Sequence, residues 1–191
     1  FGTKLSDQKI NELAYECEKA AHGIPSGVDN TVATFGSPLF YKNTDGQPKF
    51  EEINLGQPIE LVVGITGMES LTAETVTKVR NAWTQSPERY ESLFDQIAQL
   101  TLSGLDCLKT GKVEELGELM NICHGYLNAL QLSTPELEEL VHIARSHGAL
   151  GAKLTGGGGG GSMIALCQDN KDAIEAAMNK AGYKTLPYSI G

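Results

Sequence analysis

Apolar residues recur at helical spacing near the start of the chain. From Ser6 to about Ala21 they fall three or four positions apart, which is the period of a helix with one buried face. Ser6 or Asp7 can cap this helix, because each side-chain oxygen can accept a bond from a first-turn N–H. The stripe that we expect to be buried consists of Ile10, Leu13, Ala14, Cys17 and Ala21.

Short extended segments follow this helix. Residues 39–42 and 49–53 resemble strands, and the turn-forming residues between them predict a hairpin. Residues 59–66 predict a further, more apolar strand. The composition changes near residue 55, so we expect the chain to divide there.

A long helical stretch comes next, with breaks near 86–87, 110–111 and 133–135. Pro135 after Thr134 is typical of a helix start, because the first helical residue needs no N–H. The stripe before this break is Val113, Leu116, Leu119, Met120, Cys123, Leu127 and Leu130, and the stripe after it is Leu137, Leu140, Val141 and Ala144.

The last part of the chain predicts a second set of strands. Residues 149–155 and 162–167 are extended and apolar, 171–181 have helical periodicity, and 184–188 predict a final strand. The order strand, helices, strand, strand, helix, strand is that of a split βαβ, ferredoxin-like sheet with inserted helices. The expected fold class is α+β.

Composition excludes some classes of function. The 191 residues carry a net charge of −9 without a cluster of Lys and Arg, which argues against nucleic-acid binding. No apolar run reaches the roughly 20 residues of a membrane span. The cysteines form no Cys-x-x-Cys pair, so we expect reduced core residues in a cytoplasmic protein: Cys17, Cys107, Cys123 and Cys167. His124, His142 and His147 lie on different predicted helix faces, where we expect structural roles.

The most unusual feature is a run of six glycines between two predicted strands, at residues 156–161. Without Cβ atoms this loop can aim successive N–H groups at an anion, or let another chain segment approach closely. It is not a Walker loop, because no Gly-Lys-Ser/Thr sequence opens a helix after it. The alternative is a flexible surface connection.

A second group of residues carries acidic chemistry. Glu18 lies at the edge of the stripe on the first helix, and Pro25 and Gly27 then form a turn that brings Asp29 to the same end of the helix as His22. Taken singly, each residue has an ordinary explanation: a solvated carboxylate, a cation at a helix C-terminus, and an N-cap.

Together these motifs resemble the mevalonate kinase family of the GHMP small-molecule kinase superfamily. The similarity rests on Glu-x3-His-Gly-x-Pro-Ser-Gly-x-Asp-Asn at residues 18–30 and Lys-Leu-Thr-Gly-x-Gly-Gly-Gly-Gly at 153–161. The stretches 77–81, 120–121, 127–130 and 133–135 agree with it. The sequence departs from the family pattern at Gly157, where alanine is usual, and at Ser162, where cysteine is common.

The resemblance implies roles for individual residues. Asp29 would be the catalytic acid that accepts or steers the proton of a primary hydroxyl as it attacks the γ-phosphate of ATP, and Glu18 would ligate Mg²⁺. The substrate pocket would be shaped by His22, Gly23, Pro25, Ser26 and Gly27. The phosphates of ATP would lie near Gly156, Gly157, Gly158, Gly159, Gly160 and Gly161.

The resemblance covers the later part of the family sequence. It implies that residues 1–55 end an N-terminal GHMP kinase catalytic domain and that 56–191 form the C-terminal domain. The family's earlier Gly-Leu-Gly-Ser-Ser-Ala phosphate loop does not occur here, so we expect these residues alone not to phosphorylate mevalonate. The expected partners are mevalonate and ATP, and a homodimer is an assembly that relatives often adopt.

Two other functions stay open at this point. The chain can belong to another GHMP kinase, such as a phosphomevalonate or sugar kinase, because Ser-Gly-x-Asp is shared widely in the superfamily. It can also be a non-catalytic binding or dimerisation module that keeps the fold.

Overall fold

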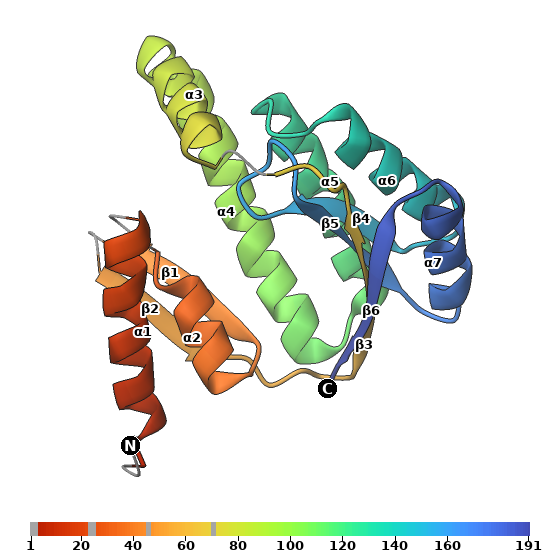
Figure 1. Cartoon of the computed structure of the whole chain (residues 1–191). Helices are drawn as coiled ribbons and strands as arrows, with labels where there is room; N and C mark the ends of the chain where they lie inside the picture. Colours follow the sequence, from red (N-terminus) through yellow and green to blue (C-terminus); the bar gives the residue numbers. More distant parts are fainter. Residues whose placement is uncertain (1–3, 23–25, 45–46, 70–71) are drawn as a thin grey trace. The chain divides into compact units, whose positions relative to one another are not determined.

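A computed structural model describes residues 4–22, 26–44, 47–69 and 72–191 of the chain (Figure 1). The chain divides into two compact units, Phe1–Asn54 and Leu55–Gly191. Among the residues described, each unit has its own β-sheet, with two strands in the first and four in the second.

The described residues of the first unit form two helices and a hairpin. Helix α1 spans Asp7–His22 and α2 spans Val28–Phe35. Strands β1 (Leu39–Thr44) and β2 (Gln47–Glu52) pair antiparallel along their whole length. The predicted first helix and the predicted hairpin are both confirmed.

The predicted buried face of α1 is wrong. Ile10 is 43% exposed, Leu13 is 48% exposed, and the Cys17 thiol, expected in the core, is exposed as well. The contact between α1 and α2 is instead polar, because the Asn30 side-chain amide donates to Asn11 Oδ1 at 2.6 Å. The periodicity therefore predicted the helix correctly but not the side that packs within this unit.

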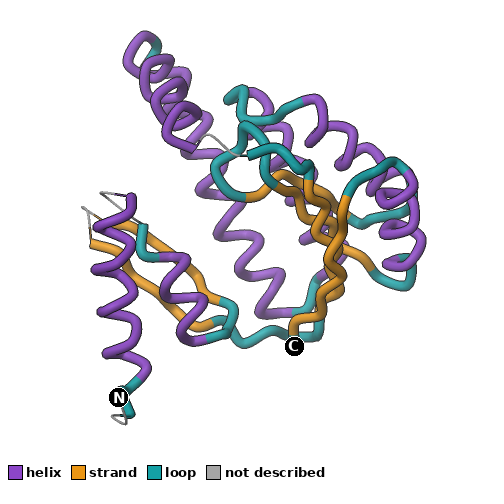
Figure 2. The backbone as a smooth tube through the Cα atoms, viewed as in Figure 1, coloured by secondary structure: helices purple, strands orange, loops and turns teal. Residues whose placement is uncertain are grey.

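The second unit is built on a four-stranded sheet with the order β4-β5-β3-β6 and antiparallel neighbours (Figure 2). The strands are β3 (Ile59–Ile65), β4 (Gly151–Thr155), β5 (Ser162–Cys167) and β6 (Lys184–Ile190). Strands β3 and β4 are parallel with β5 between them, and β5 and β6 are parallel with β3 between them. Both pairs are split βαβ units, which confirms the predicted α+β, ferredoxin-like fold.

Four helices connect β3 to β4, and a fifth connects β5 to β6. They are α3 (Thr72–Gln85), α4 (Pro87–Thr110), α5 (Val113–Ala129), α6 (Pro135–Ser146) and α7 (Lys171–Lys180). All three predicted helix breaks are confirmed. None of the helices in the described ranges has the length and apolar character needed to cross a membrane.

Local chemistry explains these breaks. Pro87 and Pro135 stand at first helical positions, where a missing N–H costs nothing. Thr134 caps α6 by accepting a hydrogen bond from the Leu137 N–H at 3.4 Å. Gly111 ends α4 with a φ of 74°, a backbone conformation that side chains with a Cβ rarely adopt.

Alternate residues of the sheet face two different layers of helices. On β5, Met163 and Ala165 belong to the same buried cluster as residues of α6 and α7, which lie side by side in Figure 1. Leu166 belongs instead to a cluster with Met120 of α5. Each fully buried Leu, Ile or Met contributes roughly 1.5–3 kcal/mol through removal from water. The residues of this kind on α6 and α7 are Leu137, Leu140, Ile174 and Met178.

Candidate active-site elements

The candidate acid Asp29 lies in the first turn of α2 and is exposed to solvent. The positive end of the helix dipole favours a negative charge at this position. Helix α2 begins one residue earlier, at Val28, so Asp29 is not the N-cap. Gly27 holds the cap position with a φ of 80°, which L side chains rarely adopt.

The turn before α2 is fixed by short-range contacts. A Cβ added to Gly27 would lie 3.4 Å from the Tyr15 ring and 3.7 Å from the Phe50 ring, so this buried residue packs between α1 and the hairpin. The Ser26 hydroxyl accepts a hydrogen bond from the Val28 N–H at 3.3 Å. These contacts hold the backbone that carries the candidate acid.

A polar network behind α2 was not predicted from the sequence. The hydroxyl of Thr31 donates to the Gly27 carbonyl at 2.6 Å, and Asn11 donates to that hydroxyl at 3.4 Å. Asn30 is only 7% exposed and donates to the side chain of Asn11. The only signal in the sequence was that Asn11 lies seven residues before Glu18 on α1, which places both on one side of the helix.

Glu18 is half-buried on α1. Its carboxylate is a hard oxygen ligand of the kind that Mg²⁺ prefers. Within the described ranges, no group of three or more His, Cys, Asp or Glu residues could hold a metal ion. A single carboxylate still fits Mg²⁺, because this ion usually keeps waters and substrate phosphates as its other ligands.

Three of the candidates for the substrate pocket lie wholly or partly outside the described residues. His22 ends α1, but its side chain lies outside the described residues, as do Gly23 and Pro25.

The six-glycine loop joins β4 to β5 and is anchored on both sides. The Gly159 N–H donates to the Leu132 carbonyl at 2.8 Å, and the Gly161 N–H donates to the Met68 carbonyl at 3.0 Å. Thr66 donates its hydroxyl to the Gly161 carbonyl at 2.8 Å. Two N–H groups that a phosphate nest could use therefore bind carbonyls of the chain itself.

Close contacts explain why several of these positions require glycine. A Cβ on Gly158 would lie 2.5 Å from the Leu132 carbonyl oxygen, and one on Gly159 would lie 2.8 Å from a methyl of Thr75. Both glycines have a φ of 73°. Gly156 has the same φ, but a Cβ there would meet nothing within 4 Å. Because these glycines lack a Cβ, the loop can pack closely against its own unit.

An apolar groove of about 380 Å³ opens beside the first two glycines of the loop. Trp83 and Phe94 form one wall, with ring centroids 6.4 Å apart in an edge-to-face arrangement. The groove is lined by Thr75, Val76, Val79, Arg80, Trp83, Phe94, Leu130, Leu132, Gly156 and Gly157. The loop therefore borders an open apolar surface as well as the carbonyls that anchor it.

Residues 105–184, which contain this loop, match the family model described as "GHMP kinases C terminal". This part of the chain is therefore similar to the C-terminal domain of GHMP kinases.

Proteins that resemble this chain extend the similarity beyond the GHMP kinase C-terminal domain. The mevalonate kinase of Pyrococcus horikoshii is 42% identical over 189 residues, which are 95% of this chain and 54% of that protein. The mevalonate kinase of Thermococcus sibiricus is 36% identical over 187 residues, with 95% and 55% covered. The chain thus spans about half the length of these curated relatives.

Solved structures give the same result. The crystal structure of L. major mevalonate kinase in complex with R-mevalonate superimposes with a TM-score of 0.92 at 34% identity, covering 98% of this chain and 59% of that one. Streptococcus pneumoniae phosphomevalonate kinase in complex with phosphomevalonate and AMPPNP has a TM-score of 0.78 at 17% identity, which shows a shared fold alone. The fold of this chain is therefore similar to that of part of each kinase.

Proposed function

We propose that this chain is the later part of a mevalonate kinase, which transfers the γ-phosphate of ATP to the primary hydroxyl of mevalonate. The similarity to proteins of that name along 95% of the chain carries the proposal. The acidic turn supports it, because the contacts around Gly27 hold Asp29 in the first turn of a helix, where it is exposed to solvent. The free cysteines suit a cytoplasmic enzyme.

In the proposed reaction, the substrate hydroxyl oxygen attacks the γ-phosphorus while the bond from that phosphorus to the ADP oxygen breaks. Asp29 accepts the hydroxyl proton, or steers it by its charge, as the new bond forms. Glu18 would hold Mg²⁺, which would supply positive charge to offset that of the phosphate oxygens. The glycine loop would lie near the phosphates, and a Cβ on Gly156 would meet none of the described atoms within 4 Å.

A coupled ADP-release assay tests the proposal on the protein that carries this chain. We expect ATP turnover with mevalonate as acceptor and little with phosphomevalonate or galactose. Preference for phosphomevalonate or galactose would assign the chain to another GHMP kinase. Absence of turnover with all three would instead support a non-catalytic module.

Glu18→Gln is expected to raise the Mg²⁺ concentration needed for half-maximal activity by about tenfold or more. The amide removes a charged ligand but preserves the shape of the side chain, so the KM for mevalonate should change much less. Titrating activity against Mg²⁺ at saturating ATP measures the effect.

Glu16→Gln is the matched control, because Glu16 is exposed on the same helix and pairs with Lys19 at 2.8 Å. Equal Mg²⁺ curves for the two variants would show that Glu18 is not a metal ligand.

A further inference from the structure

Strand β4 lies at one edge of the four-stranded sheet and pairs only with β5. An edge strand presents a row of backbone N–H and C=O groups that no neighbouring strand can satisfy. On the outward side of β4 and the residue before it, these groups are the Leu150 carbonyl and the N–H and carbonyl groups of Ala152 and Leu154. Each of them is bonded to a side chain instead.

Asn121 of α5 binds two of these groups at once. Its amide nitrogen donates to the Leu150 carbonyl at 3.2 Å, and its amide oxygen accepts from the Ala152 N–H at 3.0 Å. One asparagine thus replaces the paired bonds that a fifth strand would make.

Two cations cover the outward carbonyls. The Arg145 guanidinium on α6 donates to the Ala152 carbonyl at 2.8 Å. The Lys153 ammonium donates to the Leu154 carbonyl at 2.7 Å. Hydrogen bonds from charged donors are stronger than neutral ones, so these contacts hold the strand firmly.

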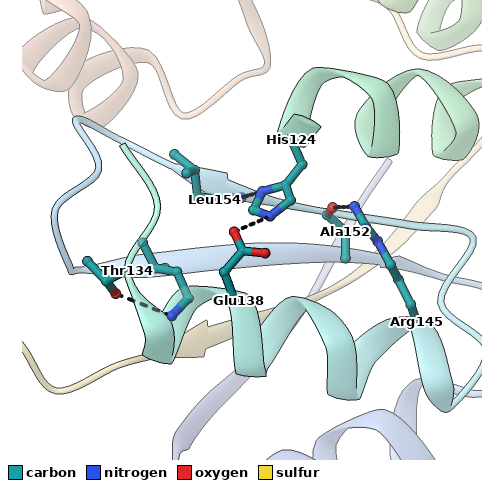
Figure 3. A network of polar contacts seen from close by, with 7 residues as sticks. His124, Thr134, Glu138, Arg145, Ala152 and Leu154 are labelled. Atoms are coloured by element: carbon teal, nitrogen blue, oxygen red, sulfur yellow. Dashed lines mark hydrogen bonds and ion pairs between the residues drawn. The ribbon is translucent and has the colours of Figure 1, made fainter. Parts of the chain in front are cut away.

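His124 completes the set, and Figure 3 shows its ring between the backbone of Leu154 and the carboxylate of Glu138. The Leu154 N–H donates to Nδ1 at 3.2 Å, and Nε2 lies 3.0 Å from Glu138 Oε1. Because Nδ1 accepts, the neutral ring must carry its proton on Nε2, which then donates to the carboxylate. His124 is 3% exposed, and these two contacts together set its tautomer.

The register of α5 along β4 depends on two glycines. Gly117, Asn121 and His124 fall four and three residues apart, which puts them on one stripe of α5. A Cβ on Gly117 would lie 2.6 Å from the Leu150 carbonyl carbon, and one on Gly151 would lie 2.2 Å from the Gly117 carbonyl oxygen. The helix therefore touches the strand backbone directly, which brings the side chains farther along the stripe within hydrogen-bonding distance.

Strand β4 leads straight into the glycine loop, with only Thr155 between Leu154 and Gly156. We propose that Asn121, His124 and Arg145 are positioning residues for this loop: by binding the outer edge of β4 they fix where the loop begins, and hence how it meets the phosphates of ATP. The phosphate half of this inference rests on the proposed kinase function.

A dependence on pH follows from His124. Its charged neighbours are Glu138 and Arg145 of α6 and Lys153 of β4. Burial lowers the pKa of His124 below its ordinary value, although Glu138 opposes this shift. The ring is therefore neutral in the folded chain at pH 7, and a proton added at Nδ1 would remove the acceptor for Leu154. The bond is intact above the unfolded-state pKa of 6.5 and is lost as pH falls through the lower folded-state pKa.

Hydrogen exchange on the full 191-residue chain, without nucleotide, tests the positioning. His124→Leu removes the acceptor, whereas His124→Asn keeps an oxygen close to the place of Nδ1. We expect the Leu variant to speed exchange at Gly159 and Gly161 by about tenfold or more relative to amides in the centre of β3, and the Asn variant to change it far less. His142→Leu is the control, because His142 is an exposed histidine on α6.

The pH arm uses the unaltered chain, so it does not depend on whether a variant folds. Exchange at Gly159 and Gly161, corrected for the intrinsic rate, should accelerate below pH 6.5 in the unaltered chain and not in His124→Asn. The inference would be overturned if the exchange rates of the loop amides changed in parallel with those of the β3 amides in every variant and at every pH. His124 would then contribute to general stability alone.

A kinetic arm connects the loop to phosphate. In the protein that carries this chain, His124→Leu should raise the KM for ATP several-fold more than the KM for mevalonate. A looser loop with an unchanged KM for ATP would overturn the phosphate half of the inference and leave the kinase proposal intact. If no acceptor is phosphorylated at all, the kinase proposal and the phosphate half fail together, while the exchange result still decides whether His124 holds the loop.

Discussion

Asp29→Asn is expected to lower kcat by about 10² to 10⁴ in the protein that carries this chain, while the KM for ATP stays within a few-fold. Asparagine keeps the size of the side chain and its place in the first turn of α2, but it cannot accept the proton of the substrate hydroxyl. Steady-state kinetics with ATP and mevalonate measure both constants.

Asp172→Asn provides the control for this substitution. Asp172 is an exposed aspartate in the first turn of α7, so its loss weakens a similar interaction with a helix dipole. A kcat that falls equally little in both variants would show that Asp29 only stabilises its helix.

The second large effect is expected in the glycine loop. Gly158→Ala should reduce the free energy of unfolding of the second unit by about 1–2 kcal/mol for an alanine in left-handed backbone, plus roughly 1–3 kcal/mol for the clash with the Leu132 carbonyl. Gly156→Ala should cost only the first amount, because it shares the φ of 73° but meets nothing within 4 Å. The difference between the two variants isolates the clash.

Urea unfolding followed by tryptophan fluorescence measures this difference. The chain has one tryptophan, Trp83, which lies in the second unit and lines the groove beside the loop. Its signal therefore reports on the unit that contains the substitutions. Equal midpoints and slopes for the two variants would mean that the loop moves away from Leu132 at no cost, contrary to an anchored loop.

Most of the second unit could be predicted from the sequence, because its signals are local. The start of α6 at Pro135 depends on the capping bond from Leu137 to Thr134, and the end of α4 depends on the left-handed backbone of Gly111. The order of helices and strands then left few topologies, since split βαβ units fix which strands are parallel.

The packing of α1 could not be predicted in the same way. The apolar residues Ile10 and Leu13 indicate which face of the helix avoids water. They do not indicate which other segment packs against that face. Asn11, which does bind α2, stands beside that stripe and carries no periodic signal of its own.

The sequence indicates candidate site residues but not the contacts that support them. Asp29 and the glycine run are contiguous motifs, so they can be found without a fold. The contacts that hold the loop join Gly159 to Leu132 and Gly161 to Met68, and nothing in the sequence indicates such distant pairs. We expected a structural role for His124, but nothing in the sequence indicated its bond to the distant Leu154 N–H.

The covered edge of β4 also bears on how the protein behaves at high concentration. A sheet grows into aggregates when an exposed edge pairs with a strand from another molecule. Side chains already occupy that edge on β4, and the opposite edge strand, β6, carries Pro187, which has no N–H to give to an incoming strand. The large exposed side chains of Leu186 and Tyr188 are thus displayed on a strand that resists such pairing, so the second unit can expose them with a reduced risk of strand-to-strand association.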